Sequence, residues 1–247
     1  MGMKDGPQRQ QHAKNFENRE AIRRTWGAQG LLNGVKIRTL FNLGRSSETS
    51  EKVDLEARTF KDIIQSSFTD TYKNLIFKTL MGLKYAFHSC SSSDYFVFVD
   101  DDAYVSVVNT LKALPKRSDT IFYSGNIIWK PSVFRNPFKK WYISIKEYPF
   151  NEYPNFVSGT FTMLTKYTLQ LFWLGTFYTK PFQFDDVFLG IIAYKLRIPV
   201  TVNIDCFNEM LEYKGPESYK SVIVMHGYES CREMEKVWLE CREAGYS

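Results

Sequence analysis

Apolar residues recur at helical spacing in some stretches of this chain and at strand spacing in others. From 72 to 88 they fall three or four positions apart on one face, which predicts an amphipathic helix with Asp70 as its N-cap. The continuous apolar run 95–99 (Tyr-Phe-Val-Phe-Val) indicates a central strand that is buried on both faces. Residues 35–41 alternate between apolar and polar side chains and predict another strand, followed by a polar loop over 44–50.

The same patterns continue along the chain, with helices and strands in alternation. Helices are expected over 18–26, 105–114, 167–174, 185–196 and 229–244, and strands over 161–164, 200–204 and 221–225. Such alternation is typical of an α/β layer fold. Residues 1–17 are polar and show no apolar period, so we expect a disordered N-terminal segment before a single domain over 18–247.

Composition and charge exclude several classes of protein. The 247 residues carry a net charge of +5, with Lys and Arg scattered among Asp and Glu, so no basic block predicts a nucleic-acid partner. No apolar run reaches the about 20 residues that a membrane span needs, and the polar residues 1–20 do not resemble a signal peptide. The four cysteines form no Cys-x-x-Cys pair, which disfavours a zinc site, while a local disulfide and reduced thiols both stay open.

Three carboxylates, Asp100, Asp101 and Asp102, follow the apolar run 95–99 directly. Adjacent acids at the end of a buried strand repel one another unless a positive charge neutralises them. Mg²⁺ and Mn²⁺ prefer oxygen ligands, and ligands of open α/β sheets bind beyond the carboxyl ends of strands. A divalent cation site is therefore the favoured interpretation, and a solvated acidic turn or helix cap is the alternative.

A second acidic pair, Asp185 and Asp186, opens the helix expected over 185–196. One of the two acids could act as a general base, although capping of the helix N-terminus alone also explains them. His226 follows the strand expected over 221–225 and is either a third metal ligand or a structural histidine. The sequence contains no motif of the common NTPases, serine hydrolases, dinucleotide oxidoreductases or zinc proteases.

Several motifs follow one another in a fixed order between Asn18 and about Trp238. They are Arg-Glu-Ala-Ile-Arg-Arg-Thr-Trp-Gly over 19–27, the stretch 56–78, the acids 100–102, the block 141–159 with Glu-Tyr-Pro and Ser-Gly, and Asp-Asp-Val over 185–187 with a glycine at 190. Each motif is weak evidence alone, but their order and spacing are specific. Together they resemble the β-1,3-galactosyltransferase and β-1,3-N-acetylglucosaminyltransferase family, the family-31 glycosyltransferases.

The resemblance implies a fold of the GT-A type, with a mixed, mainly parallel sheet flanked by helices and with the family's first strand missing from this chain. It implies a Mn²⁺ or Mg²⁺ ion held by Asp102 with Asp100 and His226, and it makes Asp186 the catalytic base. The residues expected to contact the nucleotide are Asp101, Arg23, Arg24 and Lys78, and those expected to contact the substrate are Trp141, Glu147, Tyr148, Ser158, Gly159 and Asp185.

The activity implied by the resemblance is that of an inverting hexosyltransferase. Galactose or an N-acetylhexosamine would pass from a UDP-sugar to the 3-hydroxyl of an acceptor glycan, on a glycoprotein or glycolipid, and form a β-1,3 linkage. The family works in the Golgi lumen as type II membrane proteins, and we expect the anchor to lie outside this chain. Asp185 in place of the family's glutamate favours the N-acetylglucosaminyltransferase branch, and Val157 replaces a family cysteine.

Two other interpretations stay open. A catalytically inactive or truncated family member would act as a sugar-nucleotide or glycan binding module; the missing first strand favours it and the intact acids oppose it. A metal-dependent phosphotransfer enzyme or nuclease would use the same acids, but it needs a basic phosphate cradle that the sequence does not show.

Overall fold

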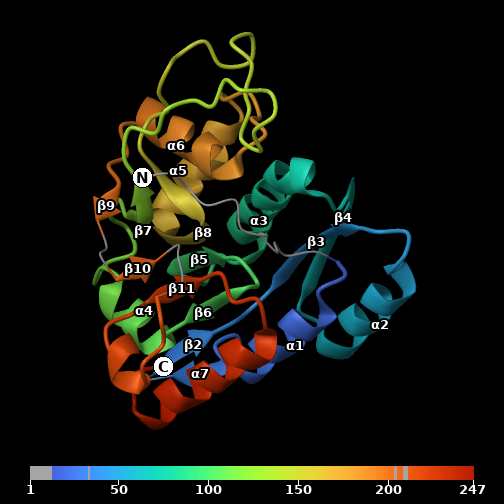
Figure 1. Cartoon of the computed structure of the whole chain (residues 1–247), viewed down its shortest axis with the longest axis vertical. Helices are drawn as coiled ribbons and strands as arrows, with labels where there is room; N and C mark the ends of the chain where they lie inside the picture. Colours follow the sequence, from blue (N-terminus) through green and yellow to red (C-terminus); the bar gives the residue numbers. More distant parts are fainter. Residues whose placement is uncertain (1–12, 33, 203–204, 208–210) are drawn as a thin grey trace. The chain divides into compact units, whose positions relative to one another are not determined.

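The computed structural model describes residues 13–32, 34–202, 205–207 and 211–247, and it divides into two compact units. The first unit comprises 1–82, 99–114 and 204–247, and the second comprises 83–98 and 115–203. Strands and helices alternate along the chain, which confirms the predicted α/β class (Figure 1). Helix α3 (Leu75–Ser89) begins in the first unit and ends in the second. A single domain over 18–247 stays a prediction.

Two small groups of strands lie in the N-terminal part of the first unit. Strands β3 (Phe41–Arg45) and β4 (Ile63–Thr69) are parallel and are connected by helix α2 (Ser50–Phe60), as parallel neighbours require. Strands β1 (Gly30–Leu32) and β2 (Val35–Ile37) pair antiparallel. The short 3₁₀ helix η1 (Tyr72–Asn74) then leads directly into α3.

A third, three-stranded sheet of the first unit lies next to the predicted metal ligands described below. Its strand order is β10 (Cys206–Phe207), β11 (Val224–His226) and β6 (Ala103–Val105), with β11 parallel to β10 and antiparallel to β6. Helices α1 (Phe16–Arg24) and α7 (Cys231–Glu243) contact each other. Two indole N–H groups hold β6: Trp26 donates to Ala103 O at 2.9 Å and Trp238 donates to Val105 O at 3.1 Å. The remaining elements of this unit are α4 (Val107–Ala113) and η2 (Pro216–Tyr219).

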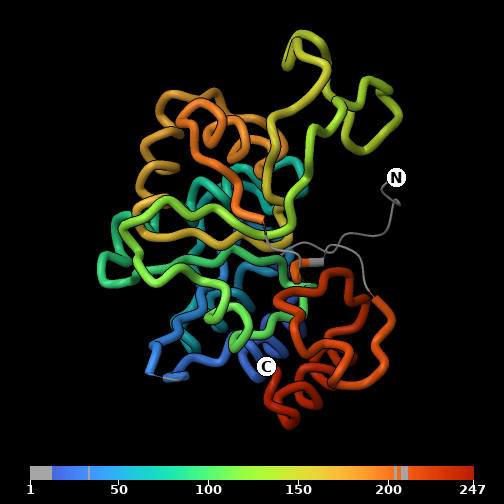
Figure 2. Tube along the Cα trace, turned by 90° about the vertical axis from the view of Figure 1, so that its left-hand side faces the viewer, coloured from blue at the N-terminus to red at the C-terminus, as the bar shows by residue number. Residues whose placement is uncertain are grey.

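The second unit contains a four-stranded sheet in the order β5 (Tyr95–Val99), β8 (Phe156–Thr165), β7 (Tyr123–Ile128) and β9 (Thr201–Val202). Helices α5 (Lys166–Thr176) and α6 (Asp185–Lys195) pack on β8 (Figure 2). A Cβ atom added to Gly190 would lie 2.5 Å from the Cβ of Phe156. The glycine is therefore required for the close approach of α6 to β8.

An ion-pair network is buried in the first unit. Arg19, only 1% exposed, donates to both carboxylate oxygens of Glu56, at 2.9 and 2.6 Å. Arg23 donates to the same carboxylate at 2.8 Å and to both oxygens of Asp62 at 2.7 and 2.9 Å. Burial alone would raise the pKa of Glu56, but the hydrogen bonds from the two arginines lower it below its ordinary value. The network ties α1 to α2 and to the residue before β4.

Most of the predicted helices are confirmed. The observed α3, α4, α5, α6 and α7 overlap the helices expected over 72–88, 105–114, 167–174, 185–196 and 229–244. The expected N-terminal helix is α1, which begins at Phe16, two residues early. Of the segment expected to be disordered, residues 1–12 lie outside the described residues, whereas Ala13 is fully buried. Predicted disorder is therefore wrong for residues 13–17.

Several strand predictions are wrong in a physically instructive way. The strand expected over 35–41 is divided, because β2 pairs with β1 while the N–H of Phe41 starts a new ladder by donating to Asp62 O. The loop expected over 44–50 begins two residues late, since β3 extends to Arg45. Strand β5 stands at one end of its sheet order and is only partly buried, with Val97 40% exposed, so it is not a central strand buried on both faces.

Asp70 is not an N-cap. Thr71 precedes η1 without a side-chain cap, and the Asp70 carboxylate instead accepts hydrogen bonds from the N–H groups of Ala13 and Gly44, both at 3.1 Å. The Asp70 carboxylate also forms an ion pair with Nζ of Lys78 at 2.8 Å. Asp70 thus links the chain before α1 to β3 and α3.

The buried network predicts a large effect of one substitution. Glu56→Gln leaves the Arg19 guanidinium buried without its counter-charge, so we expect the free energy of unfolding to fall by about 3–5 kcal/mol. Urea unfolding at neutral pH measures this change. Asp119→Asn is the control, because it breaks the exposed Arg117–Asp119 pair and is expected to change nothing measurable. Equal stability of the two variants would contradict a stabilising role for the network.

Candidate active site

The three predicted metal ligands Asp100, Asp102 and His226 lie together in the first unit. The acids immediately precede β6, and the antiparallel register of β6 with β11 places Ala103 opposite His226. Nε2 of His226 is 3.2 Å from Oδ1 of Asp102 and 4.0 Å from Oδ2 of Asp100. One ligand atom from each residue lies within 4.8 Å of the others, so the three side chains are placed to share one ion.

The chemistry of this cluster fits a divalent cation. Asp102 and His226 are buried, and the Asp100 side chain is partly exposed. Oδ1 of Asp102 is buried and accepts no hydrogen bond from the described part of the chain. Such an atom is costly to bury unless a positive charge approaches it. Carboxylate oxygens suit Mg²⁺ and Mn²⁺, and His226 adds a nitrogen ligand. Metal binding itself stays a prediction.

The acidic turn is held in place by hydrogen bonds to its backbone. The side-chain amide of Asn18 donates to Asp101 O at 3.2 Å, and the N–H of Tyr228 donates to Asp102 O at 3.1 Å. The Asp101 carboxylate is 1% exposed and accepts a hydrogen bond from Asn15 at 3.0 Å. Burial, reinforced by the charge of Asp102, raises the pKa of Asp101 to about 7. Its predicted contact with the nucleotide stays a prediction.

The second acidic pair, Asp185 and Asp186, lies in the second unit in the first turn of α6. Oδ1 of Asp186 accepts a hydrogen bond from the N–H of Val187 at 2.7 Å. Desolvation raises the pKa of Asp186 and the charge of Asp185 raises it further, whereas the N–H groups of Val187 and Gly159 oppose this shift. A carboxylate with a raised pKa is a better proton acceptor than an ordinary one, as a general base requires.

Ser158 and Gly159 of β8 lie beside this pair. A Cβ atom added to Gly159 would lie 3.7 Å from the Cβ of Asp186 and 3.9 Å from Oδ1 of Asp185. Ser158 is buried, with its Oγ 3.4 Å from Oγ1 of Thr160. The structure therefore brings three predicted substrate-binding residues, Ser158, Gly159 and Asp185, to the predicted base.

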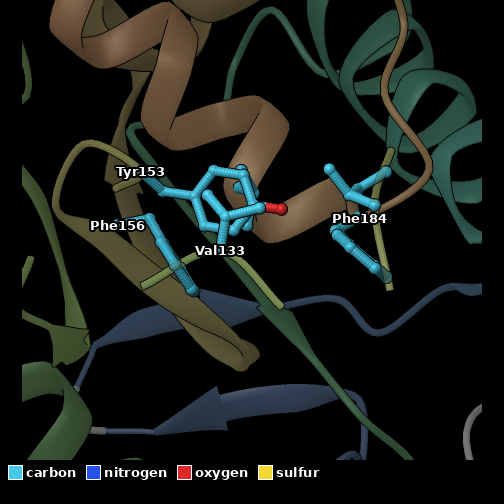
Figure 3. Close-up of a cluster of buried hydrophobic side chains, with 6 residues drawn as sticks. Val133, Tyr153, Phe156 and Phe184 are labelled. Carbon is cyan, nitrogen blue, oxygen red and sulfur yellow. The ribbon is translucent and has the colours of Figure 1, made fainter. Parts of the chain in front are cut away.

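The other predicted substrate-binding residues, Trp141, Glu147 and Tyr148, lie in the segment 129–155 between β7 and β8. Trp141 and Tyr148 pack against an apolar cluster that includes Val187 of α6. The buried members of this cluster are Val133, Ile143, Tyr153, Phe156, Phe184 and Val187 (Figure 3). Glu147 instead accepts hydrogen bonds from the N–H and Oγ of Ser144 and closes a local turn.

Two tyrosines near the predicted base were assigned no role from the sequence. The hydroxyl of Tyr123 accepts a hydrogen bond from the N–H of Val157 at 3.0 Å, and the buried hydroxyl of Tyr153 has no partner among the described residues. Burial raises the pKa of both phenols, and the charge of Asp186 contributes to both shifts. Tyr153 belongs to a recognisable motif and could have been found. Tyr123 carries no such signal.

The basic residues predicted to contact a nucleotide already have protein partners. Arg23 pairs with Glu56 and Asp62, and its guanidinium lies 4.0 Å from the ring centroid of Phe60. Arg24 pairs with exposed or partly exposed glutamates, and Lys78 pairs with Asp70. Each of these side chains is thus paired with a carboxylate of the protein. The nucleotide contacts of Arg23, Arg24 and Lys78 stay predictions.

Comparison with known proteins decides the family. Residues 17–203 match the family model described as Galactosyltransferase. This chain belongs to the galactosyltransferase family. The mixed α/β architecture agrees with the GT-A type fold that the resemblance predicted for a member of this family.

Relatives of this galactosyltransferase-family protein match it over most of its length. The chain is 38% identical to the β-1,3-galactosyltransferase brn of Drosophila melanogaster, over 94% of this chain and 73% of the relative. It is 35% identical to bre-5 of Caenorhabditis elegans, over 87% and 68%, and 33% identical to human β-1,3-galactosyltransferase 1, over 91% and 70%. A glycosyltransferase involved in glycosylation of the PBCV-1 major capsid is 16% identical and has a TM-score of 0.36, over 78% of this chain and 96% of that one.

The cluster of Asp100, Asp102 and His226 predicts that Asp102→Asn loses the binding of a divalent cation. Mn²⁺ at about 100-fold above its Kd stabilises a folded protein by about 2.7 kcal/mol, so it should raise the unfolding temperature of the protein but not that of Asp102→Asn. Thermal unfolding with and without Mn²⁺ measures the difference. Asp54→Asn, at an exposed position of α2, should keep the full response. An undiminished Mn²⁺ response in Asp102→Asn would show that the cluster does not bind the ion.

Proposed function

We propose that this protein is an inverting β-1,3-glycosyltransferase that uses a UDP-sugar donor. It transfers galactose or an N-acetylhexosamine to the 3-hydroxyl of an acceptor glycan on a glycoprotein or glycolipid. The observation that carries the proposal is that Asp100, Asp102 and His226 each place one ligand atom within 4.8 Å of the others, in a member of the galactosyltransferase family. The names of the relatives, all β-1,3-galactosyltransferases, support the linkage and the sugar.

Asp100, Asp102 and His226 would hold Mn²⁺ or Mg²⁺ in this reaction. When bound, such an ion neutralises the charge that develops on a diphosphate leaving group. The contribution of the protein is to hold the two carboxylates and the imidazole within reach of one ion, through the β6–β11 register and the hydrogen bonds to the turn. Because these contacts fix the backbone that carries the ligands, we expect the ligands to be positioned before the donor binds.

Asp186 would act as the general base. It accepts the proton of the acceptor hydroxyl as that oxygen attacks the anomeric carbon from the face opposite the leaving group. A single displacement inverts the anomer, so an α-linked donor gives a β-linked product. The raised pKa of Asp186 favours this proton transfer, and the hydrogen bond from Val187 fixes one of its oxygens.

The family resemblance also suggests where the reaction takes place. We propose that the protein works in the Golgi lumen, as a type II membrane protein whose anchor lies outside the residues described. Within the described residues no helix is both long and apolar enough to cross a bilayer.

The donor sugar has two candidates. The acidic pair Asp185–Asp186 favours an N-acetylglucosamine donor by analogy, whereas the names of the relatives favour galactose.

Substitution of the proposed base tests the function. The purified protein is assayed with UDP-galactose, UDP-N-acetylglucosamine and UDP-N-acetylgalactosamine in the presence of Mn²⁺, and the linkage of the product is determined. With the preferred donor, Asp186→Asn should lower kcat by about 10²–10⁴-fold, because the shape is kept and the proton acceptor is lost. UDP affinity should change little.

The matched control for this substitution is Asp185→Asn, in the same helical turn, which should cost much less. The assignment is reversed if Asp185→Asn is inactive and Asp186→Asn turns over normally. Binding of a UDP-sugar without transfer to any acceptor would instead favour the inactive binding module.

The pKa of Asp186 predicts a pH dependence. Only the ionised carboxylate accepts a proton, so kcat should rise with pH through the raised pKa of Asp186. Asp185→Asn removes the neighbouring negative charge that contributes to this rise, so it should lower the pKa of Asp186 and move the acid limb to lower pH. The pH profile of kcat at saturating donor and acceptor measures the shift. Superimposable acid limbs in the two proteins would exclude Asp186 as the titrating group.

A further inference from the structure

A hollow of about 710 Å³ lies in the first unit, between the hairpin of β1 and β2 and the end of α2. Its lining comes from residues 29–31, 36–38 and 60–61. Three of the lining residues, Lys36, Arg38 and Lys61, are cations, and none of those described is an acid. The lining therefore carries a charge of 3 − 0 = +3, and we call it the basic hollow. Its volume is within the range of small-molecule binding sites.

The cations of the basic hollow are not neutralised by the protein. None of the three forms an ion pair with a residue that the structure describes. Arg23 differs from them, although its guanidinium lies only 4.0 Å from the centroid of the Phe60 ring, which lines the hollow. It forms ion pairs with the buried acids Glu56 and Asp62. Uncompensated charges of one sign around a hollow attract a ligand of the opposite sign.

Only one of the three cations is explained by the fold itself. Lys61 is the C-cap residue of α2, where a positive charge stabilises the end of the helix. Lys36 lies in β2, opposite Leu31 of β1, and Arg38 follows β2 directly. Alternate residues of a strand lie on the same face, so β2 directs both of these cations to the basic hollow. No helix end accounts for this pair.

The uncharged part of the lining suits a sugar. The Phe60 ring is 48% exposed even with the Arg23 guanidinium over it, and Leu31 is 74% exposed. The apolar C–H face of a sugar can pack on such a ring, whose face carries a partial negative charge. A diphosphate is less suitable, because phosphates are usually held at the N-terminus of a helix, and the basic hollow borders the C-terminus of α2.

The basic hollow is separate from the predicted metal ligands. Two of its cations directly precede β3 and β4, so it lies where these parallel strands begin. The acidic turn lies where they end: Asp70, directly after β4, accepts a hydrogen bond from the N–H of Ala13, and Asn15 donates to Asp101. Strand β4 has seven residues, so its two ends are roughly 20 Å apart at about 3.3 Å per residue. The predicted substrate-binding residues belong to the second unit.

We propose that the basic hollow binds an acidic saccharide. Its carboxylate or sulfate groups contact Lys36, Arg38 and Lys61, and one sugar face packs on the Phe60 ring. Binding here does not depend on the proposed transfer reaction, because it needs neither a donor, a metal ion nor a catalytic base. The ligand is a glycan, so the site is compatible with the lumenal location proposed above.

Calorimetric titration of the full chain, without donor or metal, tests this proposal. Three tetrasaccharides serve as probes: one from heparin with sulfates and carboxylates, one from hyaluronan with carboxylates only, and a neutral one from chitin. We expect binding of an acidic probe that weakens with salt, and no binding of the chitin probe. Equal binding of both acidic probes assigns the carboxylate, and binding of the heparin probe alone assigns the sulfate. Binding of neither acidic probe would overturn the proposal, and displacement by UDP would overturn it in favour of a nucleotide site.

Matched variants locate the ligand. Lys36→Gln with Arg38→Gln should weaken binding of the acidic probe about tenfold, because two ionic contacts are lost. Lys52→Gln with Lys73→Gln removes two exposed charges of the same unit outside the hollow and should bind as the protein does. Equal loss in both double variants would show binding by net charge alone and overturn the site.

A third variant removes the remaining cation without disturbing the backbone. Lys61 has a φ of 55°, and Asn tolerates this left-handed conformation, so Lys61→Asn should fold normally. It should weaken binding of the acidic probe and leave the unfolding temperature unchanged. Undiminished binding in Lys61→Asn and in the Lys36/Arg38 variant would place the saccharide elsewhere on the protein.

Discussion

A carboxylate that folding removes from water needs a counter-charge, a set of hydrogen-bond donors or a proton, and this requirement shapes the buried acids of both units. In the first unit Glu56 and Asp62 form ion pairs with the arginines 19 and 23 of α1. Asp70 forms an ion pair with Lys78 and accepts hydrogen bonds from two backbone N–H groups. These acids are satisfied within the protein. They connect helices and strands that lie far apart in the sequence.

The acids at positions 101 and 102 satisfy the same requirement in different ways, although they are neighbours. Asp101 accepts a hydrogen bond from Asn15, and its pKa is raised to about 7, so its carboxylate can take up a proton near neutral pH. Asp102 has an oxygen without a donor, beside the imidazole of His226 and close to the carboxylate of Asp100. Oδ1 of Asp101 is likewise buried and accepts no hydrogen bond from the described residues, so this feature alone does not separate the two acids. Asp102 differs from Asp101 because it lies close to Asp100 and His226, where the three side chains could share an ion.

The sequence predicted those parts of the candidate site whose placement depends only on neighbouring residues in the chain. An apolar run followed at once by acids fixes both β5 and the position of Asp100 and Asp102, and Asp185 and Asp186 lie in the first helical turn that their pattern predicts. His226 was named from its place after the strand expected over 221–225, but its distance from Asp102 depends on the β6–β11 register, which no local pattern contains. The resemblance gave Arg23 and Lys78 as nucleotide contacts, which stay predictions; their carboxylate partners Glu56, Asp62 and Asp70 come from tertiary packing and could not be predicted from the local sequence. Helix α2 and strand β4 were missed because their stability comes from packing: β4 carries Gln-Ser-Ser at its centre, and its parallel pairing with β3 overrides this weak local preference.

The pair Asp185–Asp186 shows how the backbone can give two identical side chains different roles. Successive helical residues point about 100° apart, so the two carboxylates cannot face the same direction. Gly190 brings α6 close to Phe156 of β8, and this approach sets Asp186 beside Gly159. A Cβ atom at position 159 would lie about 4.0 Å from Oδ2 of Asp186, so any larger side chain there would start in contact with this carboxylate. Both glycines thus act on the same residue: Gly190 permits the approach of α6 to β8, and Gly159 keeps a side chain away from the Asp186 carboxylate.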